Sequence, residues 1–538
     1  MKKLFAIILA LALIFAMSTT ALAEENTSLT VNAADRTFVG YQLLKLTTSL
    51  KTEDHHEAHE GDHSKNCYNY AYTVNENYRA ILQAETLANG RNELWVTNGK
   101  PADASGVTDA QILEYLGYQT SDEAGVYQTM RQVADRIYRE IKDAQLTPDK
   151  TDLTGANNTI EQGYWMFVDI SDLNDDNAAN SLVVVDTMGE NTVTITPKTA
   201  LPTVEKKVKD IEDSEDDKID DNPWHDSADH DYLDAVPFKL TGTLPSNAQY
   251  YKSFQMIFHD TLSAGLTLNA DSVTVLMYDT KHKADVDTDL NDGKDVTENF
   301  DVTTTGLTDG CTFEVACENV FAIEGVTKDT TFVVSYNATL NETAVIGAAG
   351  NPNEVYMEFS NDPYDSTSTG KTETDKVTVF TYQLIVNKVD NQDHALKGAG
   401  FTLYKKNLAG KYVAIGEELV GGDMTTFIWK GLDDGDYMLV ETTVPEGYNK
   451  MTDIEFSISA THSETDGEPK LLTLDGGLMG EGIVATGIIE KDIVNNTGIA
   501  LPSTGAQGTM LLIGGGTMLV MVAAVFMITR KKMSVYED

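Results

Sequence analysis

Two lysines stand on strand faces whose other residues are apolar. In an extended strand, residues two apart share a face, so Lys206 lies on the same side as Val204 and Val208. By the same alternation, Lys388 shares a face with Val386. Burial of an ammonium without a partner is costly and drives its pKa down toward the neutral amine. We therefore expect both lysines to point into a core in a nucleophilic form.

A neutral lysine next to an asparagine and a protonated carboxylic acid can form a covalent bond. The amine attacks the amide carbon, the acid polarises the carbonyl and shuttles protons, and ammonia leaves behind an isopeptide bond. The alternative for each lysine is a side chain at a strand end whose ammonium reaches solvent.

The two lysines open two of three expected domains. Residues 202–380 and 381–500 consist of strand-like segments between Gly, Asn and Asp turns, as in antiparallel sandwiches. Residues 24–201 mix strand-like ends with a helical middle, in which Thr108 precedes a capped helix and residues 126–141 have helical spacing. We predict a mainly β chain of tandem Ig-like (Cna-type) β-sandwich domains, the first with a helical insertion, followed by a C-terminal transmembrane helix.

Residues 381–500 resemble a Cna B-type domain. The resemblance rests on LIVNKVD at 384–390, LKGAGFTLY at 396–404, GDYMLVET at 435–442 and PEGY at 445–448. In that family the lysine of the first strand bonds to an asparagine of the last strand with help from a glutamate. The resemblance assigns these roles to Lys388, Asn495 and Glu441, with Asn496 as the alternative acceptor.

Residues 202–380 resemble the isopeptide-forming middle domain of Gram-positive backbone pilins, from PTVEKKV at 202–208 to FSNDP at 359–363. This resemblance implies Lys206 as the lysine, Asn361 as the acceptor and Asp260 as the acid, with Asp234 as a competing carboxylate. In the first domain, Asp169 occupies a place similar to that of Glu441, but no lysine and asparagine complete the set. A bond in that domain is left open.

The C-terminal residues have the form of a membrane-held sorting signal. An uncharged stretch from Thr509 to Thr529 is long enough to span a bilayer as a helix, and the basic residues 530–532 behind it favour a cytoplasmic end. The segment before it resembles the LPXTG signal of Gram-positive surface proteins. The resemblance implies that a sortase cuts after Thr504; the five residues are Leu501, Pro502, Ser503, Thr504 and Gly505.

The N-terminal residues predict export, and one further lysine predicts polymerisation. Two lysines, an apolar run over residues 4–17 and a small-residue site indicate a signal peptide that is cut after Ala23. Lys198 follows Pro197, where the chain leaves the first domain. Its context resembles the pilin lysine that attacks the sortase acyl-enzyme, although Thr196 replaces the usual aromatic residue. The alternative is an ordinary surface lysine.

Composition excludes some classes of function. The formal net charge of −45 disfavours nucleic acid and anionic lipid as partners. Three cysteines, of which Cys311 and Cys317 are too far apart on an extended strand to join, provide no disulfide framework. No phosphate-binding glycine loop, His-Glu-x-x-His helix or serine nucleophile elbow is present. We expect no cofactor.

Two segments offer weak metal motifs. His55, His59 and His63 would share a helix face and could bind Zn²⁺, but the segment has no large apolar residues to anchor it, which favours a solvated insertion. Residues 287–298 imitate a calcium loop, but Gly293 falls one place too late for an EF-hand turn. We interpret that segment as a polar loop.

These features predict a structural protein and not an enzyme. The expected protein is the backbone subunit of a covalent pilus on the wall of a Gram-positive bacterium, in which sortase joins Thr504 of one copy to Lys198 of the next. Expected partners are a pilus-polymerising sortase, other copies of the chain, minor pilins and peptidoglycan, with a host or glycan ligand as a further one. The alternatives are a singly anchored adhesin and a wall-anchored hydrolase with paired carboxylates.

Overall fold

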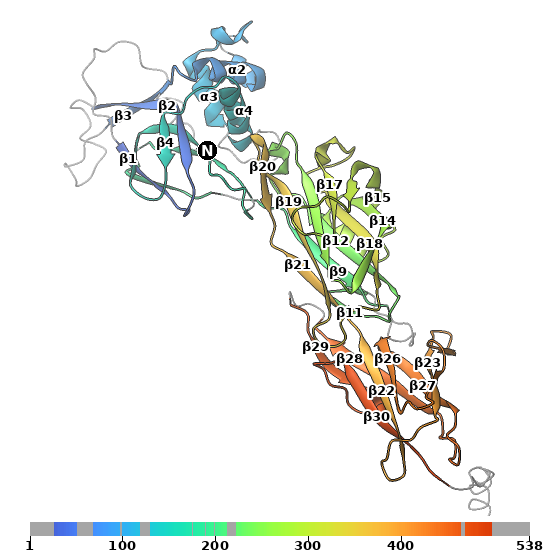
Figure 1. The fold of residues 1–538 in the computed structure, drawn as a ribbon. Coiled ribbons are helices and arrows are strands. Elements are labelled where there is room, and N and C mark those ends of the chain that lie inside the picture. Colours follow the sequence, from blue (N-terminus) through green and yellow to red (C-terminus); the bar gives the residue numbers. More distant parts are fainter. Residues whose placement is uncertain are drawn as a thin grey trace, which may run out of the picture.

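The structure is a computed structural model that describes residues 26–50, 68–96, 99–118, 130–174, 176–188, 190–197, 200–211, 222–463 and 468–497. Its strands pair within three groups, residues 26–195, 204–380 and 382–495, which we call the first, second and third domains. Figure 1 shows these domains in a row along an elongated molecule. The prediction of a mainly β fold is confirmed.

The first domain has a sheet that is covered on both faces. The sheet runs β3 (Tyr68–Val74), β2 (Phe38–Leu50), β6 (Gly163–Asp169) and β7 (Leu182–Asp186), with β4 (Lys150–Leu153) also on β2. A second sheet joins β5 (Asn158–Glu161), β1 (Asn26–Val31) and β8 (Thr192–Ile195). Trp165 and Phe167 pack toward this second sheet, whereas Met166 and Val168 pack toward the helices. Because side chains alternate between the two faces along β6, this one strand contributes residues to both hydrophobic cores.

The helices of the first domain are α2 (Arg79–Asn89), α3 (Asp109–Tyr118) and α4 (Met130–Asp143), with short 3-10 turns at Asn92–Trp95 and Ala104–Gly106. Thr108 caps α3 as expected, because its backbone N–H donates to Gln111 Oε1 at 2.9 Å and its hydroxyl accepts from the Gln111 N–H at 3.4 Å. On α4, Val133, Ile137 and Ile141 are fully buried, as their spacing predicted.

The second domain is a two-layer sandwich. One sheet runs β10 (Trp224–His225), β9 (Val204–Lys209), β12 (Ala235–Thr243), β18 (Thr331–Leu340), β14 (Leu266–Tyr278) and β15 (Lys294–Asp295). The other runs β11 (Ser227–Asp229), β21 (Asp375–Phe380), β19 (Asn351–Asp362), β13 (Met256–Leu262), β17 (Phe313–Cys317) and β16 (Asp301–Thr303), with β20 (Asp365–Lys371) also on β19. Phe238, Phe258, Val334 and Met357 fill the space between the sheets.

Short helices decorate the loops of this sandwich: α5 (Lys281–Val286) and 3-10 turns at Ala248–Tyr250, Thr297–Asn299 and Val320–Ala322. In the strand-like segment at residues 250–258, the strand begins only at Met256, because the chain first makes the turn at Ala248–Tyr250. The exact start of a strand depends on its pairing partners, which the sequence pattern does not contain.

The third domain is a smaller sandwich. Its first sheet runs β26 (Thr426–Leu432), β22 (Tyr382–Asp390) and β30 (Ile488–Asn495). Its second sheet runs β24 (Tyr412–Ala414), β23 (Gly400–Lys406), β27 (Gly435–Thr443), β28 (Ile454–His462) and β29 (Leu471–Asp475), with β25 (Leu419–Val420) also on β23 and a 3-10 turn at Gly477–Met479. The first strand β22 and the last strand β30 are parallel neighbours, with Lys388 opposite Ile493.

The domains contact one another through backbone hydrogen bonds. Between the first and second domains, Asn180 N–H donates to Asn361 O at 2.8 Å. Between the second and third, Tyr232 N–H donates to Gly431 O at 2.9 Å, and Lys405 of the third domain pairs with Asp231 at 2.7 Å. Among the described residues no helix has the length and apolar content to cross a bilayer, and the span expected at residues 509–529 lies outside them.

We expect Gly431→Ala to destabilise the junction of the second and third domains. A Cβ on Gly431 would lie 1.9 Å from the Tyr232 ring, and the backbone has φ +69°. Gly410 is the matched control, since it has φ +72° with open space around it. The positive φ should cost both variants about 1–2 kcal/mol, and the clash should cost Gly431→Ala about 1–3 kcal/mol more. Denaturant unfolding measures the difference; equal losses would contradict this account of the junction.

Candidate functional site

The predicted lysine of the second domain lies in a closed polar cluster. Lys206 on β9 and Asp260 on β13 are both fully buried and form an ion pair across the sandwich. The Tyr336 hydroxyl on β18 accepts from Lys206 Nζ at 3.1 Å and donates to Asp260 Oδ2 at 2.9 Å. The inward position of Lys206 and its pairing with Asp260 agree with the sequence predictions.

The asparagine in this cluster is Asn353. It is fully buried on β19, and its Nδ2 donates to the Tyr336 hydroxyl at 2.8 Å, so it shares one hydroxyl with Lys206. Asp260 pairs across the strands with Val355, which places Asn353 two residues away from Asp260's partner, on the same face of the sheet. Asn353 therefore has the position that an acceptor for Lys206 needs.

Asn361 has a different place, which corrects the predicted acceptor. Its Nδ2 donates to Leu173 O of the first domain at 2.8 Å, and its Oδ1 accepts from Ser368 Oγ at 2.6 Å. Asn361 is eight residues beyond Asn353 along the same chain segment, and eight residues of strand span roughly 27 Å. Its side chain thus stabilises the contact between the first two domains.

The charges of the cluster favour a reactive amine. Burial lowers the pKa of the Lys206 ammonium to about 8, although the nearby Asp260 opposes this shift. Burial also raises the pKa of Asp260, against the effect of Lys206. Asp260 Oδ1 and Asn353 Oδ1 are both buried acceptors without a hydrogen-bond partner. If Asp260 is protonated, its O–H group can donate a hydrogen bond to a buried oxygen such as Asn353 Oδ1.

The third domain holds the three residues that the resemblance named. Lys388 and Glu441 are fully buried, and Asn495 is 1% exposed. Asn495 Nδ2 donates to Glu441 Oε1 at 2.6 Å, and the Met451 N–H donates to Glu441 Oε2 at 2.8 Å. Lys388 Nζ donates to Ile493 O at 2.7 Å, two residues before Asn495 on β30.

Burial lowers the pKa of Lys388 to about 8, with Glu441 as the opposing charge. Asn495 Oδ1 is buried without a partner. The alternative acceptor Asn496 lies one residue further on, beyond the end of β30. Lys388, Glu441 and Asn495 therefore form a second set of amine, acid and amide in one core.

Both sets can perform the same reaction. The neutral Nζ attacks the asparagine Cγ, a C–N bond forms as the bond to Nδ2 breaks, and Nδ2 leaves as ammonia after the acid has passed on a proton. A dry core keeps water from competing for the amide carbon. Such a reaction would occur once per set and within one chain, which differs from the turnover of an enzyme.

The first domain has an ion pair at the corresponding place. Arg36 Nη1 lies 2.7 Å from Asp169 Oδ2 and also donates to Ala179 O at 3.1 Å, while Ser171 Oγ donates to Asp169 Oδ1 at 2.6 Å. A guanidinium stays protonated and is not a nucleophile. Asp169 therefore pairs with a group that cannot serve as the amine of an isopeptide bond.

Several predicted residues lie outside the described ones. These are Ala23, the histidines His55, His59 and His63, the pilin lysine Lys198, and the sorting residues 501–505. The calcium-like loop is described, and the Asp287 carboxylate accepts from the N–H groups of Asn291 and Asp292 and from the Tyr278 hydroxyl. Asp287 therefore stabilises its own loop, in agreement with the polar-loop interpretation.

Sequence reasoning missed Tyr336 and Asn353. Both residues lie on the inward face of their strands, where every second residue is buried. On β19, Asn353 lies between Asn351 and Val355 on this face. An asparagine with apolar residues on its strand face was the available signal. It was not used, because the resemblance pointed to a later asparagine.

Two parts of the chain match models of known families. Residues 382–469 match the prealbumin-like fold domain, and residues 493–534 match the LPXTG cell wall anchor motif. The second match confirms the predicted LPXTG anchor and indicates that the chain is anchored to a Gram-positive cell wall. The predicted β-sandwich in the third domain agrees with the first match.

The chain is also similar to individual proteins. The trypsin-resistant surface T6 protein of Streptococcus pyogenes serotype M6 is 27% identical over 234 residues, which are 40% of this chain and 40% of that protein. The chain therefore matches less than half the length of this relative.

Solved structures that the chain matches include major pilins. The T6 backbone pilin of S. pyogenes has 18% identity and a TM-score of 0.47, with 90% of this chain and 100% of that chain covered. The major pilin SpaD of Corynebacterium diphtheriae has 17% identity and a TM-score of 0.40, with 71% and 90% covered.

The choice between the two asparagines can be tested by mass. Each bond releases ammonia, so we expect the exported chain to weigh about 17 Da less than its formula per bond, or about 34 Da for two. Asn353→Ala should retain only one deficit, and the control Asn361→Ala should retain both. Intact mass spectrometry measures this. Loss of a deficit in Asn361→Ala alone would restore Asn361 as the acceptor.

Proposed function

We propose that this chain is the backbone subunit of a covalent surface pilus. In the proposed polymer, sortase cleaves after Thr504 and joins its carboxyl group to Lys198 of the next copy. The observation that carries the proposal is the pair of buried lysine, acid and asparagine sets in consecutive sandwiches ahead of a cell wall anchor. Such sets stabilise domains that bear load, and a polymer bears load along its whole length.

We further propose that Lys206 bonds to Asn353 and Lys388 to Asn495. The shared Tyr336 hydroxyl supports the first pair, and the contact of Lys388 Nζ with β30 supports the second. The similarity to T6 and to other major pilins is consistent with this role. The function is structural, and the partners are sortase and further copies of the chain.

The polymer can be tested in cells that express this chain and its sortase. Detergent-boiled wall extracts, blotted with antiserum, should show a ladder of high-mass species. Lys198→Ala should reduce the ladder to a single band, because no other lysine is expected to accept the sortase acyl group. Lys328→Ala is the control, since this lysine is exposed and lies in the second domain. A single band for the wild type would favour the singly anchored adhesin.

Loss of the acid should weaken the third domain. Glu441→Gln keeps the size of the side chain and its contact with the Met451 N–H but lacks the acid that the reaction needs. A bond from Lys388 to Asn495 closes a loop of roughly 100 residues, so its absence should lower the free energy of unfolding by about 4–5 kcal/mol.

Denaturant unfolding followed at the third domain measures this loss, and Glu446→Gln, an exposed position nearby, is the control. The variant should also retain the ammonia that the wild type loses, so its mass should be about 17 Da higher once the mass change of the substitution is subtracted. A Glu441→Gln protein with wild-type stability and an undiminished mass deficit would contradict the assigned role.

A further inference from the structure

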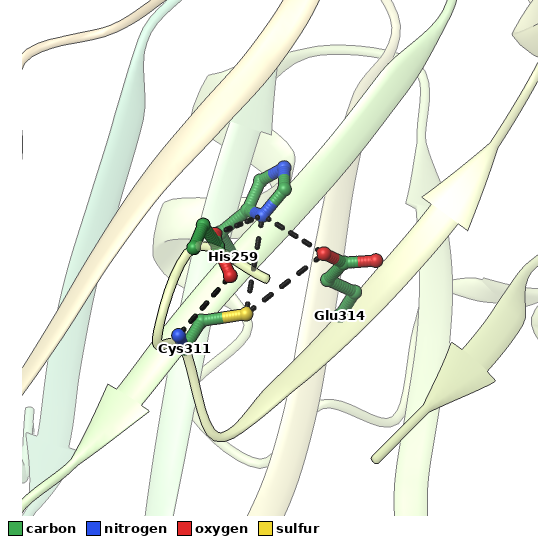
Figure 2. A group of neighbouring side chains, drawn as sticks. His259, Cys311 and Glu314 are labelled. Carbon is green, nitrogen blue, oxygen red and sulfur yellow. Dashed lines mark hydrogen bonds and ion pairs between the residues drawn. The ribbon is translucent and has the colours of Figure 1, made fainter. Parts of the chain in front are cut away.

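A second polar cluster lies on the outer face of the sandwich that contains Lys206. Phe258 and Asp260 point inward from β13, so His259 between them points outward, directly opposite Glu314 of β17. Asp309 and Cys311, from the loop that leads into β17, complete the group. Figure 2 shows the His259 ring, the Cys311 thiol and the Glu314 carboxylate turned toward one another.

The spacing of these atoms suits a tetrahedral metal ion. His259 Nδ1 lies 2.9 Å from Asp309 Oδ2, 3.3 Å from Glu314 Oε1 and 4.0 Å from Cys311 Sγ. Cys311 Sγ lies 3.9 Å from Glu314 Oε1, and one ligand atom of each residue falls within 4.8 Å of all the others. Ligands at about 2.0–2.3 Å around tetrahedral Zn²⁺ are roughly 3.3–3.8 Å apart. Small side-chain rotations would bring the four atoms to these distances.

The surroundings orient the imidazole as a metal ligand requires. His259 is 6% exposed, and its Nε2 is buried without a hydrogen-bond partner. Glu358 Oε2 lies 3.9 Å from His259 Nε2. Gln255 Nε2 donates to the other oxygen of this carboxylate, Oε1, at 3.1 Å. When Nδ1 binds a metal, Nε2 carries the proton and faces this carboxylate, as in carboxylate–histidine–zinc arrangements.

Tyr356 fixes two members of the cluster. Its ring stacks on His259 with centroids 4.5 Å apart and an interplanar angle of 6°. Its hydroxyl donates to Asp309 Oδ2 at 2.6 Å. The loop itself is attached to β13, because the Thr312 N–H donates to Asp260 O at 2.7 Å. The four ligand residues are therefore held in place by groups that do not ligate.

The cluster brings two carboxylates and one thiol together beside a single imidazole. A divalent ion bound there would balance the negative charge of these ligands, since a thiol that coordinates a metal is deprotonated.

We propose that His259, Asp309, Cys311 and Glu314 bind one Zn²⁺ ion. Imidazole and thiolate ligands select zinc over calcium and magnesium, and the two carboxylates complete the tetrahedron. The ion ties the loop before β17 to β13, next to the strand residue Asp260 of the inner cluster. It also protects Cys311, one of the free cysteines of the described residues, from oxidation outside the cell.

Cobalt reports the site directly, because a thiolate bound to Co²⁺ gives a near-ultraviolet charge-transfer band. Purified full-length protein should develop this band with one Co²⁺ per chain, and Zn²⁺ should abolish it. Cys311→Ser should lose the band. Cys67→Ser and Cys317→Ser are the controls and should keep it, which also separates this site from the histidine-rich segment around His55.

Two further variants keep the test decisive if Cys311→Ser folds poorly. Glu314→Gln should shift the cobalt titration to higher concentration, and Glu358→Gln, which alters only the group facing Nε2, should weaken binding about 10–100-fold while the band at saturation stays. Far-ultraviolet circular dichroism checks the fold of each. Absence of the band from the wild type, or its persistence in Cys311→Ser, would overturn the proposal.

Discussion

Lys206 and Lys388 each place an amine in a core that excludes water, and the organisation of both sandwiches follows from how that amine is accommodated. A buried ion pair is a weak source of stability, because the desolvation of both charges offsets their attraction. An amide bond to asparagine removes the titratable nitrogen and leaves a neutral, hydrogen-bonding group. The same burial that makes the lysine costly as an ion makes it reactive as a neutral amine.

Strand alternation was sufficient to predict that Lys206 and Lys388 point into a core, but not which asparagine each one faces. Asn351, Asn353 and Asn361 share one face of β19 and are all fully buried, so periodicity cannot distinguish them. The choice depends on the register of β19 against β13, in which Asp260 lies opposite Val355. In the third domain the proposed acceptor Asn495 lies on β30, the strand next to that of Lys388, and the resemblance had named this residue. The outer cluster around His259 likewise depends on register, because its residues come from β13 and from the loop before β17.

The first domain fits the proposed polymer in a different way. Its Asp169 is paired with Arg36, and the sheet is stabilised by apolar cores on both faces. If Lys198 is the point of attachment, pulling force enters the chain after residue 197 and leaves at Thr504. The first domain then lies beside the load path, and a noncovalent core is adequate there. The two proposed covalent bonds belong to the two domains that the force would cross.

The position of each acceptor determines which residues remain under load. A bond from Lys388 to Asn495 joins the first and last strands of the third domain, so the force bypasses residues 389–494. A bond from Lys206 to Asn353 bypasses residues 207–352 and leaves residues 354–380 in the path. Val377 of β21, which belongs to that segment, pairs with Asn353, and the ladder continues to Val379 opposite Asn351. The load can therefore pass from the bond into the last strand across adjacent hydrogen bonds. Because β20 lies between β19 and β21 in the sequence, the hydrogen bonds that join β19 to β21 must break before the force can extend β20.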